Sequence, residues 1–570
     1  MKTIAPEKIN LCGMTGALVE GITKNFLIGI RESNPAIVTM FRDRDVKPYR
    51  DLLPWSGEFV GKYLTSAAYT YRLNRSEELC AYVCKVIDEL LTYQASDGYL
   101  GCYTTECRLS GKARSLSEES CTTWDSWSHY HLMYGLLLWH DITHNKNYFT
   151  AIERIAELFI HSFYNGRPTL LSIGSTEMNL SVYHVFALLY RRTKNPDYLA
   201  FARLIERDLN SPGSGEYMRY ALEGYEYYQC PKPRWESMHA IMGFVEMYNA
   251  TGEERYITAA TKIFYSILKT DIHNTGAFST KEQAVGNPFE RGSIETCCVV
   301  AYNALASDLY LVSGDPAIID FLELSHYNAI LGSHSPYGYW STYDTPMEGE
   351  RKANYHKIVF QSRPGSPDLN CCSVNAPRGV AQLADWMLAE KNGVTYINFY
   401  EAMTASLKDG VSIRIEGNYP ACDRVKITLD SNGKHTFALH IPAWSKKTEL
   451  RTGETICSPA AGEYHKIAVN GKTELELKFD FTPYTSEGGG DFAGKRSIYI
   501  GPILYGFENA ENPTLDISDA EVSLSDLASA VPEMRADRSL CLKLASGVVC
   551  SKRLLNQVVG KSLRTHNLKS

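Results

Sequence analysis

Residues 59–91 read FVGKYLTSAAYTYRLNRSEELCAYVCKVIDELL, a stretch with two apolar stripes separated by one polar break. In the first half, apolar residues return every fourth position, at Phe59, Tyr63, Ala67 and Tyr71, and therefore share one helix face. The break covers residues 75–78. A second stripe at helical spacing follows it, made of Leu79, Val83, Val86, Ile87, Leu90 and Leu91. The stretch predicts two helices joined by a short turn.

Similar polar breaks recur along the first part of the chain. They stand at residues 145–148, 194–198, 252–256 and 314–316, and each precedes a new amphipathic run. The intervals leave room for two helices and two connections. Five such hairpins and a last helix at about 380–390 predict a mainly α fold with β structure, in which an (α/α)6 toroid forms the first domain. An open superhelical solenoid is the alternative, because a repeat does not show that the ring closes.

The sequence changes character after Asn392 and Gly393, where alternating strands replace helices. Apolar residues alternate with polar ones in three segments, 411–415, 425–429 and 437–441, and the stretches 473–481 and 497–505 continue this texture. Such alternation is typical of a β-sandwich. We place the toroid at 1–395, the β-sandwich domain at 396–510 and a short β or irregular segment at 511–570. We leave open that the first residues pair with the β-domain.

Charge and hydropathy narrow the classes of partner. The chain has 570 residues and a net charge of -7, so it carries no basic field that would hold nucleic acid or anionic lipid. No apolar run approaches the roughly 18 residues of a membrane span, and the longest, 132–139, is flanked by His131 and His140. We therefore expect neither nucleic acid nor a membrane as a partner, whereas a homodimer stays open.

The N-terminal residues and the cysteine content bear on the compartment. Pro6, Glu7 and Lys8 interrupt the region where a signal peptide would need an apolar stretch. With 15 cysteines and no export signal, the chain is expected to be cytoplasmic and to keep its thiols reduced. Some of these thiols are then candidates for metal ligands.

Cysteine and glutamate gather in two short segments. Glu295-Thr296-Cys297-Cys298 forms the first and Cys371-Cys372 the second. Zinc prefers thiolate, imidazole and carboxylate ligands in a tetrahedron, and four such groups from two segments would complete that shell. From spacing alone, a metal site and a set of buried structural thiols remain equally good interpretations.

These segments and several others resemble glycoside hydrolase family 127, a family of β-L-arabinofuranosidases. The resemblance covers roughly residues 50 to 510, and the order of the matching segments is more specific than any one of them. They are Gln94 with Asp97-Gly98-Tyr99-Leu100, Met238-His239-Ala240, Asn274-Thr275-Gly276, Glu295-Thr296-Cys297, Tyr343-Asp344-Thr345-Pro346, Asn370-Cys371-Cys372, Ile441-Pro442-Ala443-Trp444 and Gly501-Pro502-Ile503-Leu504-Tyr505.

The resemblance implies an α/α-toroid catalytic domain, β-sandwich domains and a zinc site. The positions that match the zinc ligands are Glu295, Cys297, Cys371 and Cys372, with Cys371 matching the nucleophile of a retaining exo-glycoside hydrolase. Coordination to zinc would keep such a thiol deprotonated, so that it attacks the anomeric carbon of an oligosaccharide or glycoside substrate. We therefore count Glu295 and Cys371 among the catalytic residues.

Two upstream glutamates are candidates for the acid/base. Glu282 lies 13 residues before Glu295 and Glu290 lies 5 before it, both closer than the family's usual interval. We favour Glu282, because it follows Gly276 as the family's acid follows its glycine-rich turn. Glu290 stands beside Arg291 and is interpreted as a surface ion-pair partner.

The resemblance also implies substrate-binding residues, although these positions match the family less specifically than the zinc ligands do. His239, Tyr343 and His131 match residues that bind the sugar, whereas another sugar-binding histidine is replaced near Asn179. A lone helical histidine is more often a core residue, and the tryptophans Trp124, Trp127 and Trp340 fit a pocket and a core equally well.

Two other functions compete with this interpretation. One is a metal-independent toroid hydrolase or epimerase that acts on uronic or amino sugars. The other is a non-catalytic carbohydrate-binding scaffold with a structural zinc, against which the candidate acid Glu282 argues.

Overall fold

The structure of the protein is a computed structural model. It describes residues 1–6, 8–113, 121–164, 168–345, 350–351, 367–508, 511–514, 516, 521–535, 540–544, 549–552, 560–561 and 567–569. Within the predicted motifs, Pro346 lies outside the described residues.

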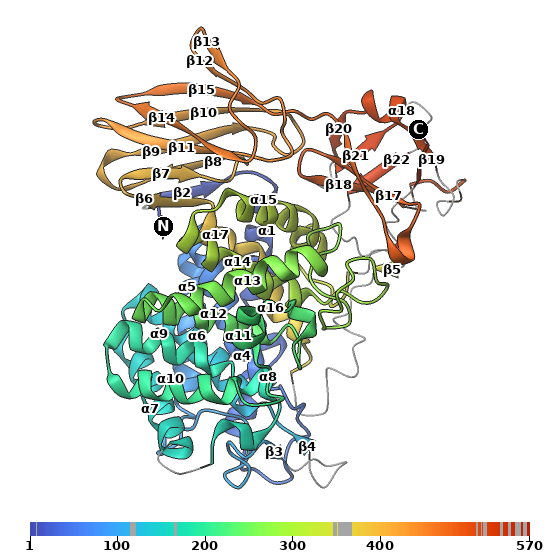
Figure 1. Cartoon of the computed structure of the whole chain (residues 1–570). Helices are drawn as coiled ribbons and strands as arrows, with labels where there is room; N and C mark the ends of the chain where they lie inside the picture. Colours follow the sequence, from blue (N-terminus) through green and yellow to red (C-terminus); the bar gives the residue numbers. More distant parts are fainter. Residues whose placement is uncertain are drawn as a thin grey trace.

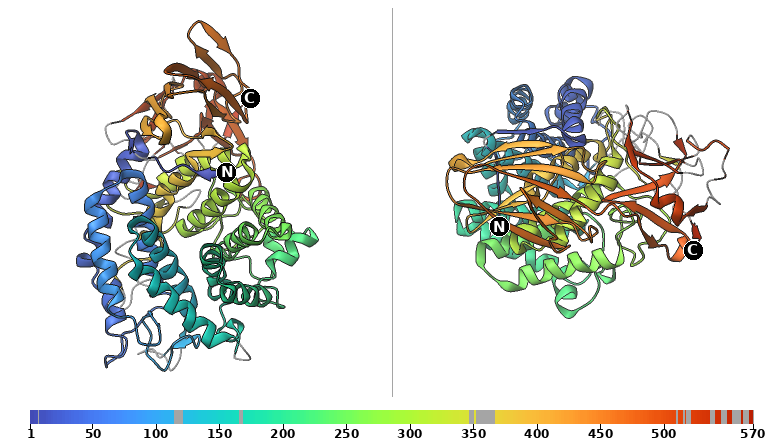
Figure 2. Two further views of the ribbon diagram at one scale, coloured as in Figure 1. Left: turned by 90° about the vertical axis from the view of Figure 1, so that its left-hand side faces the viewer. Right: turned by 90° about the horizontal axis from the view of Figure 1, so that it is seen from above.

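Six helices form a closed inner ring in chain order (Figures 1 and 2). Each contacts the next, and the last contacts the first, so the toroid is confirmed and the open solenoid is wrong. The inner helices are α4 (Glu58–Asn74), α6 (Asp125–Thr143), α9 (Val182–Thr193), α12 (Ser237–Thr251), α14 (Thr296–Ser313) and α16 (Cys371–Ala381).

An outer helix packs against each step of this ring. The outer helices are α5 (Glu77–Leu91), α7 (Lys146–Phe163), α10 (Pro196–Leu209), α13 (Glu254–Thr270) and α15 (Pro316–Ser325), and α1 (Met14–Ile22) contacts both α4 and α16 where the ring closes. Because each of the first five inner helices is followed by an outer one that runs back, the inner helices start at the same end of the ring. The residues that precede the first turns of the inner helices therefore lie close together.

The polar breaks of the sequence are the turns between inner and outer helices. The side chains of four residues accept a backbone N–H from the first turn of α5, α7, α10 and α15, namely Ser76, Asn145, Asn195 and Asp315. Such caps satisfy donors that a helix start leaves unpaired. The repeat was visible in the sequence because these four helices begin with the same capping chemistry, whereas Glu253 at the start of α13 makes no side-chain cap.

The last predicted helix, at 380–390, is wrong in its position. The helix α16 starts at Cys371, a short helix α17 (Leu383–Trp386) follows, and strand β6 (Leu388–Lys391) begins directly after it. Strand β6 pairs with β7 (Val394–Ile397) and with β1 (Lys2–Thr3) from the other end of the chain. That long-range pairing overrides the local helical pattern of residues 380–390.

Two sheets form the β-sandwich that lies over the ring (Figure 1). One has the order β1-β6-β7-β11-β14, with β11 at His435–Ile441 and β14 at Glu463–Val469. The other has the order β13-β12-β15-β10-β9-β8-β2. Its strands are β13 (Thr455–Cys457), β12 (Glu449–Thr452), β15 (Thr473–Lys478), β10 (Arg424–Asp430), β9 (Ser412–Gly417), β8 (Met403–Ser406) and β2 (Lys8–Leu11).

A third sheet, of order β16-β17-β18-β22-β21-β20, forms a separate C-terminal unit (Figure 1). Its strands are β16 (Tyr484–Glu487), β17 (Arg496–Ile500), β18 (Ile503–Phe507), β22 (Val549–Lys552), β21 (Leu540–Lys543) and β20 (Pro532–Met534). The predicted stretch 497–505 is thus two strands, joined at Gly501, where φ is +56°.

A buried carboxylate joins the ring to the sandwich. Glu323 on α15 accepts hydrogen bonds from the Tyr419 hydroxyl at 2.5 Å and from Nε1 of Trp444 at 2.9 Å. Burial raises the pKa of Glu323 to about 7, and it also raises the pKa of the nearby Asp320 to about 7. The Pro442-Ala443-Trp444 segment of the sequence therefore has a structural role at this junction.

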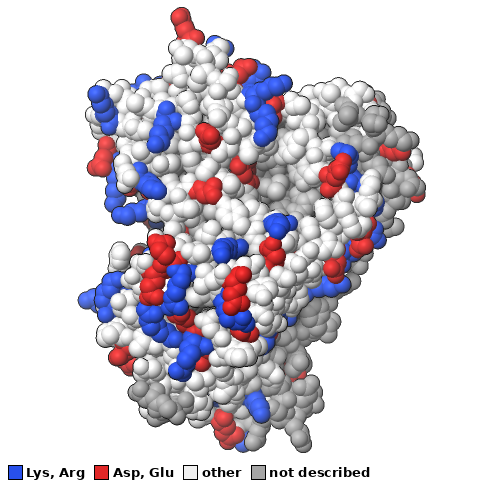
Figure 3. All heavy atoms as spheres, in the orientation of Figure 1, with Lys and Arg blue, Asp and Glu red and all other residues white. Residues whose placement is uncertain are grey.

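Helix α14 is an apolar stretch that the hydropathy analysis of the sequence did not single out. By length and composition its 18 residues are apolar enough to cross a membrane, but 78% of this window is buried inside the protein. The helix lies in the inner ring between α12 and α16, which accounts for its apolar surface. On the face drawn in Figure 3, positive and negative side chains are interspersed.

Candidate active site

A pocket opens where the inner helices begin. Its empty volume, which includes adjoining solvent, is about 530 Å³. The lining residues come from the starts of five inner helices, α4, α6, α12, α14 and α16, and from the loops before them, and are Trp55, Glu58, Trp124, Arg234, Trp235, Glu236, Glu282, Glu295, Tyr343 and Cys371. The parallel arrangement of the inner helices brings these distant segments together.

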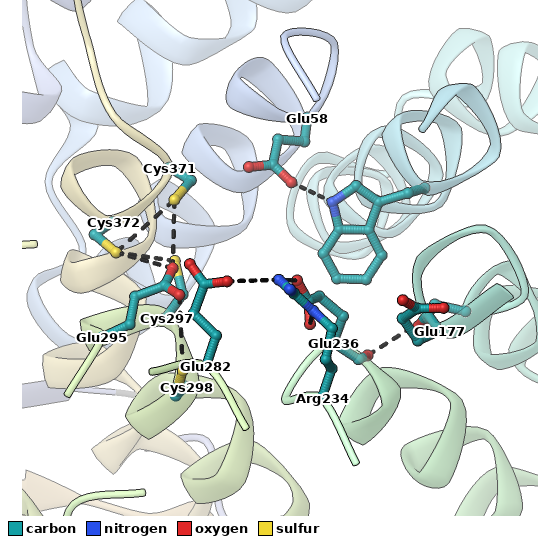
Figure 4. Close-up of polar contacts among 12 residues, drawn as sticks. Glu58, Glu177, Arg234, Glu236, Glu282, Glu295, Cys297, Cys298, Cys371 and Cys372 are labelled. Atoms are coloured by element: carbon teal, nitrogen blue, oxygen red, sulfur yellow. Dashed lines mark hydrogen bonds and ion pairs between the residues drawn. The ribbon is translucent and has the colours of Figure 1, made fainter. Parts of the chain in front are cut away.

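One wall of the pocket holds a compact set of groups that could hold a metal ion, called the metal-binding set and the metal-binding wall below. The ligand atoms of Glu295, Cys297, Cys371 and Cys372 all lie within 4.8 Å of one another, and all four residues are buried (Figure 4). Oε1 of Glu295 is 3.5 Å from Sγ of Cys371 and 3.3 Å from Sγ of Cys372, and the Sγ atoms of Cys372 and Cys297 are 3.4 Å apart. Three sulfurs and one carboxylate fit the donors that zinc prefers.

Local sequence explains how these groups meet. Asn370 caps α16, since its side chain accepts the N–H of Ser373 at 2.8 Å while Oγ of Ser373 accepts the N–H of Asn370 at 3.3 Å. Cys371 and Cys372 are thus the first two residues of that helix. Glu295 stands at the N-cap of α14, so two helix N-termini face the cluster. Their positive ends favour thiolate and carboxylate groups.

The protein environment already favours one thiolate in the cluster. Although burial opposes ionisation, hydrogen bonds from Cys371 and Cys372 and the Lys62 ammonium 3.9 Å away hold the pKa of Cys297 well below its usual value. The contact with Cys297 raises the pKa of Cys371, and burial raises the pKa of Cys372. The protein side chains by themselves therefore favour ionisation of Cys297 over ionisation of Cys371.

Only one of the three cysteines reaches the pocket. Cys371 is 6% exposed and lines the wall, whereas Cys297 and Cys372 are 0% exposed and lie behind it. Cys298 is also buried, and its Sγ contacts Oε2 of Glu295 at 3.8 Å.

Glu282 approaches the pocket from a tight turn. Thr280 and Gln283 form an antiparallel bridge, and the two residues between them, Lys281 and Glu282, have φ values of +49° and +67°. A left-handed backbone costs a non-glycine residue about 1 kcal/mol, and such conformations cluster at functional sites. The turn directs the Glu282 carboxylate into the pocket, where Oε1 accepts the hydroxyl of Tyr343 at 2.9 Å.

An arginine connects Glu282 to a second buried carboxylate. The guanidinium of Arg234 donates to Oε2 of Glu282 at 2.7 Å and to both oxygens of Glu236 at 2.6 and 2.9 Å (Figure 4). Burial raises the pKa of Glu236 to about 7. Glu290 does not line the pocket and makes a 3.7 Å ion pair with Lys281 rather than with Arg291.

Tyr343 is held beside the metal-binding wall by backbone contacts. Its carbonyl accepts the N–H of Thr296 at 2.9 Å, and the backbones of Asp344 and Glu295 form an antiparallel β-bridge. The loop with Tyr343 is therefore fixed to the start of α14. Burial raises the pKa of Tyr343 well above its usual value, so its hydroxyl stays protonated and donates to Glu282.

The predicted histidines lie behind the pocket wall. His239 and His131 are 0% and 1% exposed, and their rings pack against Trp127. Nδ1 of His239 is 2.8 Å from the hydroxyl of Tyr130, while Nε2 of each histidine has no partner among the described residues. Their assignment to substrate binding stays a prediction.

Asn179 and the tryptophans divide between structure and pocket. Asn179 accepts the N–H of Trp127 at 3.3 Å and donates to the carbonyl of Gly174 at 2.9 Å, so it fixes the start of α6. Trp124 lines the pocket, and its ring lies 5.0 Å from that of Trp55. Trp127 and Trp340 are buried and do not line it.

Sequence reasoning missed a charged pair inside the ring. Glu58 and Lys62 lie one turn apart on α4, are 2% and 1% exposed, and form an ion pair of 2.9 Å. Buried charges of this kind are rare unless they are paired. The sequence carries a signal only for Lys62, which interrupts an apolar run, because a charged residue at a helix start such as Glu58 is usually exposed.

Comparison with known proteins agrees with this geometry. A model of the β-L-arabinofuranosidase GH127 catalytic domain matches residues 31–385, which is more than half of the chain, and the GH127 middle domain matches 394–482. The chain belongs to glycoside hydrolase family 127. It is therefore a β-L-arabinofuranosidase-like glycoside hydrolase, which argues against the non-catalytic scaffold.

Individual relatives of the family are distant in sequence. A non-reducing end β-L-arabinofuranosidase of Bifidobacterium longum is 22% identical over 510 residues, which cover 80% of this chain and 75% of the relative. A GH127 β-L-arabinofuranosidase structure from Geobacillus stearothermophilus matches with a TM-score of 0.75 at 16% identity, covering 99% of this chain and 100% of that one. A second GH127 β-arabinofuranosidase structure gives a TM-score of 0.73 at 18% identity over 99% and 94% of the two chains. These likenesses establish the shared fold.

Proposed function

We propose that this family 127 enzyme is a retaining exo-β-L-arabinofuranosidase that uses Cys371 as nucleophile and Glu282 as acid/base. In the proposal, zinc is held by Glu295, Cys297, Cys371 and Cys372. The observation that carries it is the double position of Cys371, which belongs to the metal-binding set and also lines the pocket. A purely structural metal site has no need to present one of its ligands to a pocket.

The donor set supports a resident zinc ion. Its residues offer three sulfurs and one carboxylate at the spacing of a shared ion, inside a buried site that faces two helix N-termini. When bound, zinc would keep the coordinated thiols deprotonated at neutral pH. Tyr343 and Asp344 then act as supports that keep Glu295 in place.

In the first half of the reaction, Sγ of Cys371 attacks the anomeric carbon. The bond between this carbon and the leaving oxygen breaks, and Glu282 transfers its proton to that oxygen. The product is a glycosyl thioether on Cys371. The Tyr343 hydroxyl and Arg234 hold the Glu282 carboxyl in its position throughout.

In the second half, Glu282 acts as base. It accepts a proton from water, whose oxygen attacks the anomeric carbon and displaces the sulfur of Cys371. Two displacements at one carbon retain its configuration. The choice of a terminal L-arabinofuranosyl residue rests on the relative from Bifidobacterium longum, whose name specifies the non-reducing end.

The metal-independent alternative on uronic sugars is less compatible with the pocket. Its described lining carries four carboxylates, and its single lining cation, Arg234, is already bound to Glu236 and Glu282. A substrate carboxylate would meet repulsion there. An amino sugar is not disfavoured by this charge.

A panel of nitrophenyl glycosides, with and without added zinc and thiol reductant, tests the proposed function. We expect hydrolysis of the β-L-arabinofuranoside, retention of anomeric configuration by NMR, and loss of activity after chelation. Hydrolysis of uronides or amino sugars that survives chelation would favour the alternative. Inverted product would contradict the nucleophilic role of Cys371.

A further inference from the structure

We propose that Glu58 is a substrate-binding residue that accepts hydrogen bonds from hydroxyl groups of a neutral sugar. The inference rests on the proposed function and adds a specificity residue to it. Glu58 lines the same pocket as Cys371 and Glu282, from the first turn of α4. In Figure 4 the carboxylates of Glu58 and Glu282 come from opposite sides and point toward each other, with Cys371 beside them.

The Glu58 carboxylate is fixed from behind. Oε1 lies 2.9 Å from Nζ of Lys62, and Oε2 accepts the indole N–H of Trp127. Each oxygen receives one donor and has two lone pairs, so each can accept one more hydrogen bond. Because both oxygens are already held in place, little side-chain entropy is lost when a ligand binds.

The Lys62 ammonium also packs against two indole rings, which keeps the Glu58–Lys62 ion pair rigid. Nζ of Lys62 lies 5.5 Å from the ring centre of Trp127 and 5.3 Å from that of Trp235. The same ammonium is 3.9 Å from Sγ of Cys297. Lys62 thus couples the position of Glu58 to the metal-binding wall, and we assign it a positioning role.

The chemistry of the pocket selects the ligand class. Glu58 can accept from sugar hydroxyls, which are donors that a neutral sugar supplies in pairs. A uronate would place its negative charge among the carboxylates of the pocket, while the lining cation Arg234 is occupied. Glu58 therefore favours neutral sugars and disfavours acidic ones.

Deoxy substrates test this assignment, because they remove one hydroxyl at a time. We would measure kcat/KM of the wild type and of Glu58→Gln on a nitrophenyl β-L-arabinofuranoside and on its 2-, 3- and 5-deoxy analogues. We expect Glu58→Gln to lower kcat/KM about 10- to 100-fold on the parent but less than about 3-fold on at least one analogue, since that hydroxyl no longer needs its acceptor. Equal losses on the parent and all analogues would overturn the assignment.

Glu282→Gln is the matched control. Because Glu282 acts on the leaving group and not on the sugar hydroxyls, this substitution should lower kcat/KM by the same factor on all four substrates. Metal content and melting temperature of each variant show whether the site is intact. If Glu58→Gln does not fold, the double variant Glu58→Gln/Lys62→Met removes both buried charges together and takes its place.

Binding of free L-arabinose, followed by saturation-transfer NMR, separates this inference from the proposed function. An absence of glycosidase activity would refute the proposed function, but Glu58 is still tested by binding. We expect the wild type to bind L-arabinose at least about 10-fold more tightly than Glu58→Gln and to prefer it to glucuronate. Equal binding by both proteins, a preference for glucuronate, or no binding of L-arabinose by the wild type would overturn the inference.

Discussion

Cys371 lines the pocket, whereas Cys372, the next residue in the chain, is buried behind it. Both thiols contact Oε1 of Glu295, at 3.5 and 3.3 Å, so both belong to the metal-binding set. They differ because successive residues in the first turn of α16 point in different directions. The helix start therefore places one cysteine at the pocket and keeps the other inside the cluster.

The first prediction concerns metal content. We expect about one zinc ion per chain, and we expect Cys297→Ser and Cys372→Ser to lower its affinity about 10-fold or more, since each removes one thiolate. Inductively coupled plasma mass spectrometry after dialysis against a weak chelator measures this. Cys102→Ser, in a buried cysteine outside the cluster, is the control and should keep its zinc. Full zinc retention in both cluster variants would refute the ligand assignment.

The second prediction concerns the proton donor. Glu282→Gln should lower kcat/KM, which reports the first half of the reaction, about 100- to 10,000-fold on substrates with poor leaving groups, and far less on nitrophenyl glycosides, which need little protonation. Glu290→Gln should keep kcat within about 2-fold, because Glu290 does not line the pocket. Steady-state kinetics over a series of leaving groups decides between them. The opposite ranking would assign the acid/base to Glu290.

The third prediction concerns the junction between the ring and the sandwich. Burial raises the pKa of Glu323 from 4.5 to about 7, so the folded state holds this proton more tightly than the unfolded state. The stabilising contribution is complete below pH 4.5 and is lost as the pH rises through 7. The free energy of unfolding should thus fall across this window, by roughly 3 kcal/mol for this group.

Glu323→Gln should flatten that decline, because an amide does not ionise. Urea unfolding at pH 5 and pH 8 measures the effect, and the variant of the exposed Glu449, Glu449→Gln, is the control. An unchanged pH dependence in Glu323→Gln would show that this carboxyl does not titrate in the window.

Much of the ring could be predicted from the sequence, because the helical hairpins carry their own apolar stripes and four of the five outer helices begin with a capping residue. The cap Ser76 and the stripe from Leu79 to Leu90 are local signals. The start of α16 was harder to place, since strand β6 pairs with β1 from the far end of the chain. Local periodicity contains no information about such a partner.

The cysteine cluster was also visible in the sequence, since its residues stand in two short motifs. Glu58 and Arg234 were not, because they belong to the pocket only after the ring brings the starts of separate helices together. A charged residue at a helix start is usually exposed, so only the closed ring distinguishes Glu58 from a surface residue.

Covalent labelling tests the central claim most directly. A cyclophellitol-type epoxide with the shape of β-L-arabinofuranose carries its electrophilic carbon where the anomeric carbon would lie, and should react with the nucleophile alone. Peptide mass spectrometry of the zinc-loaded enzyme is expected to show one adduct, on Cys371, and Cys371→Ser should abolish both labelling and turnover. An adduct on Cys372, Glu282 or Glu295 would contradict the thiolate mechanism.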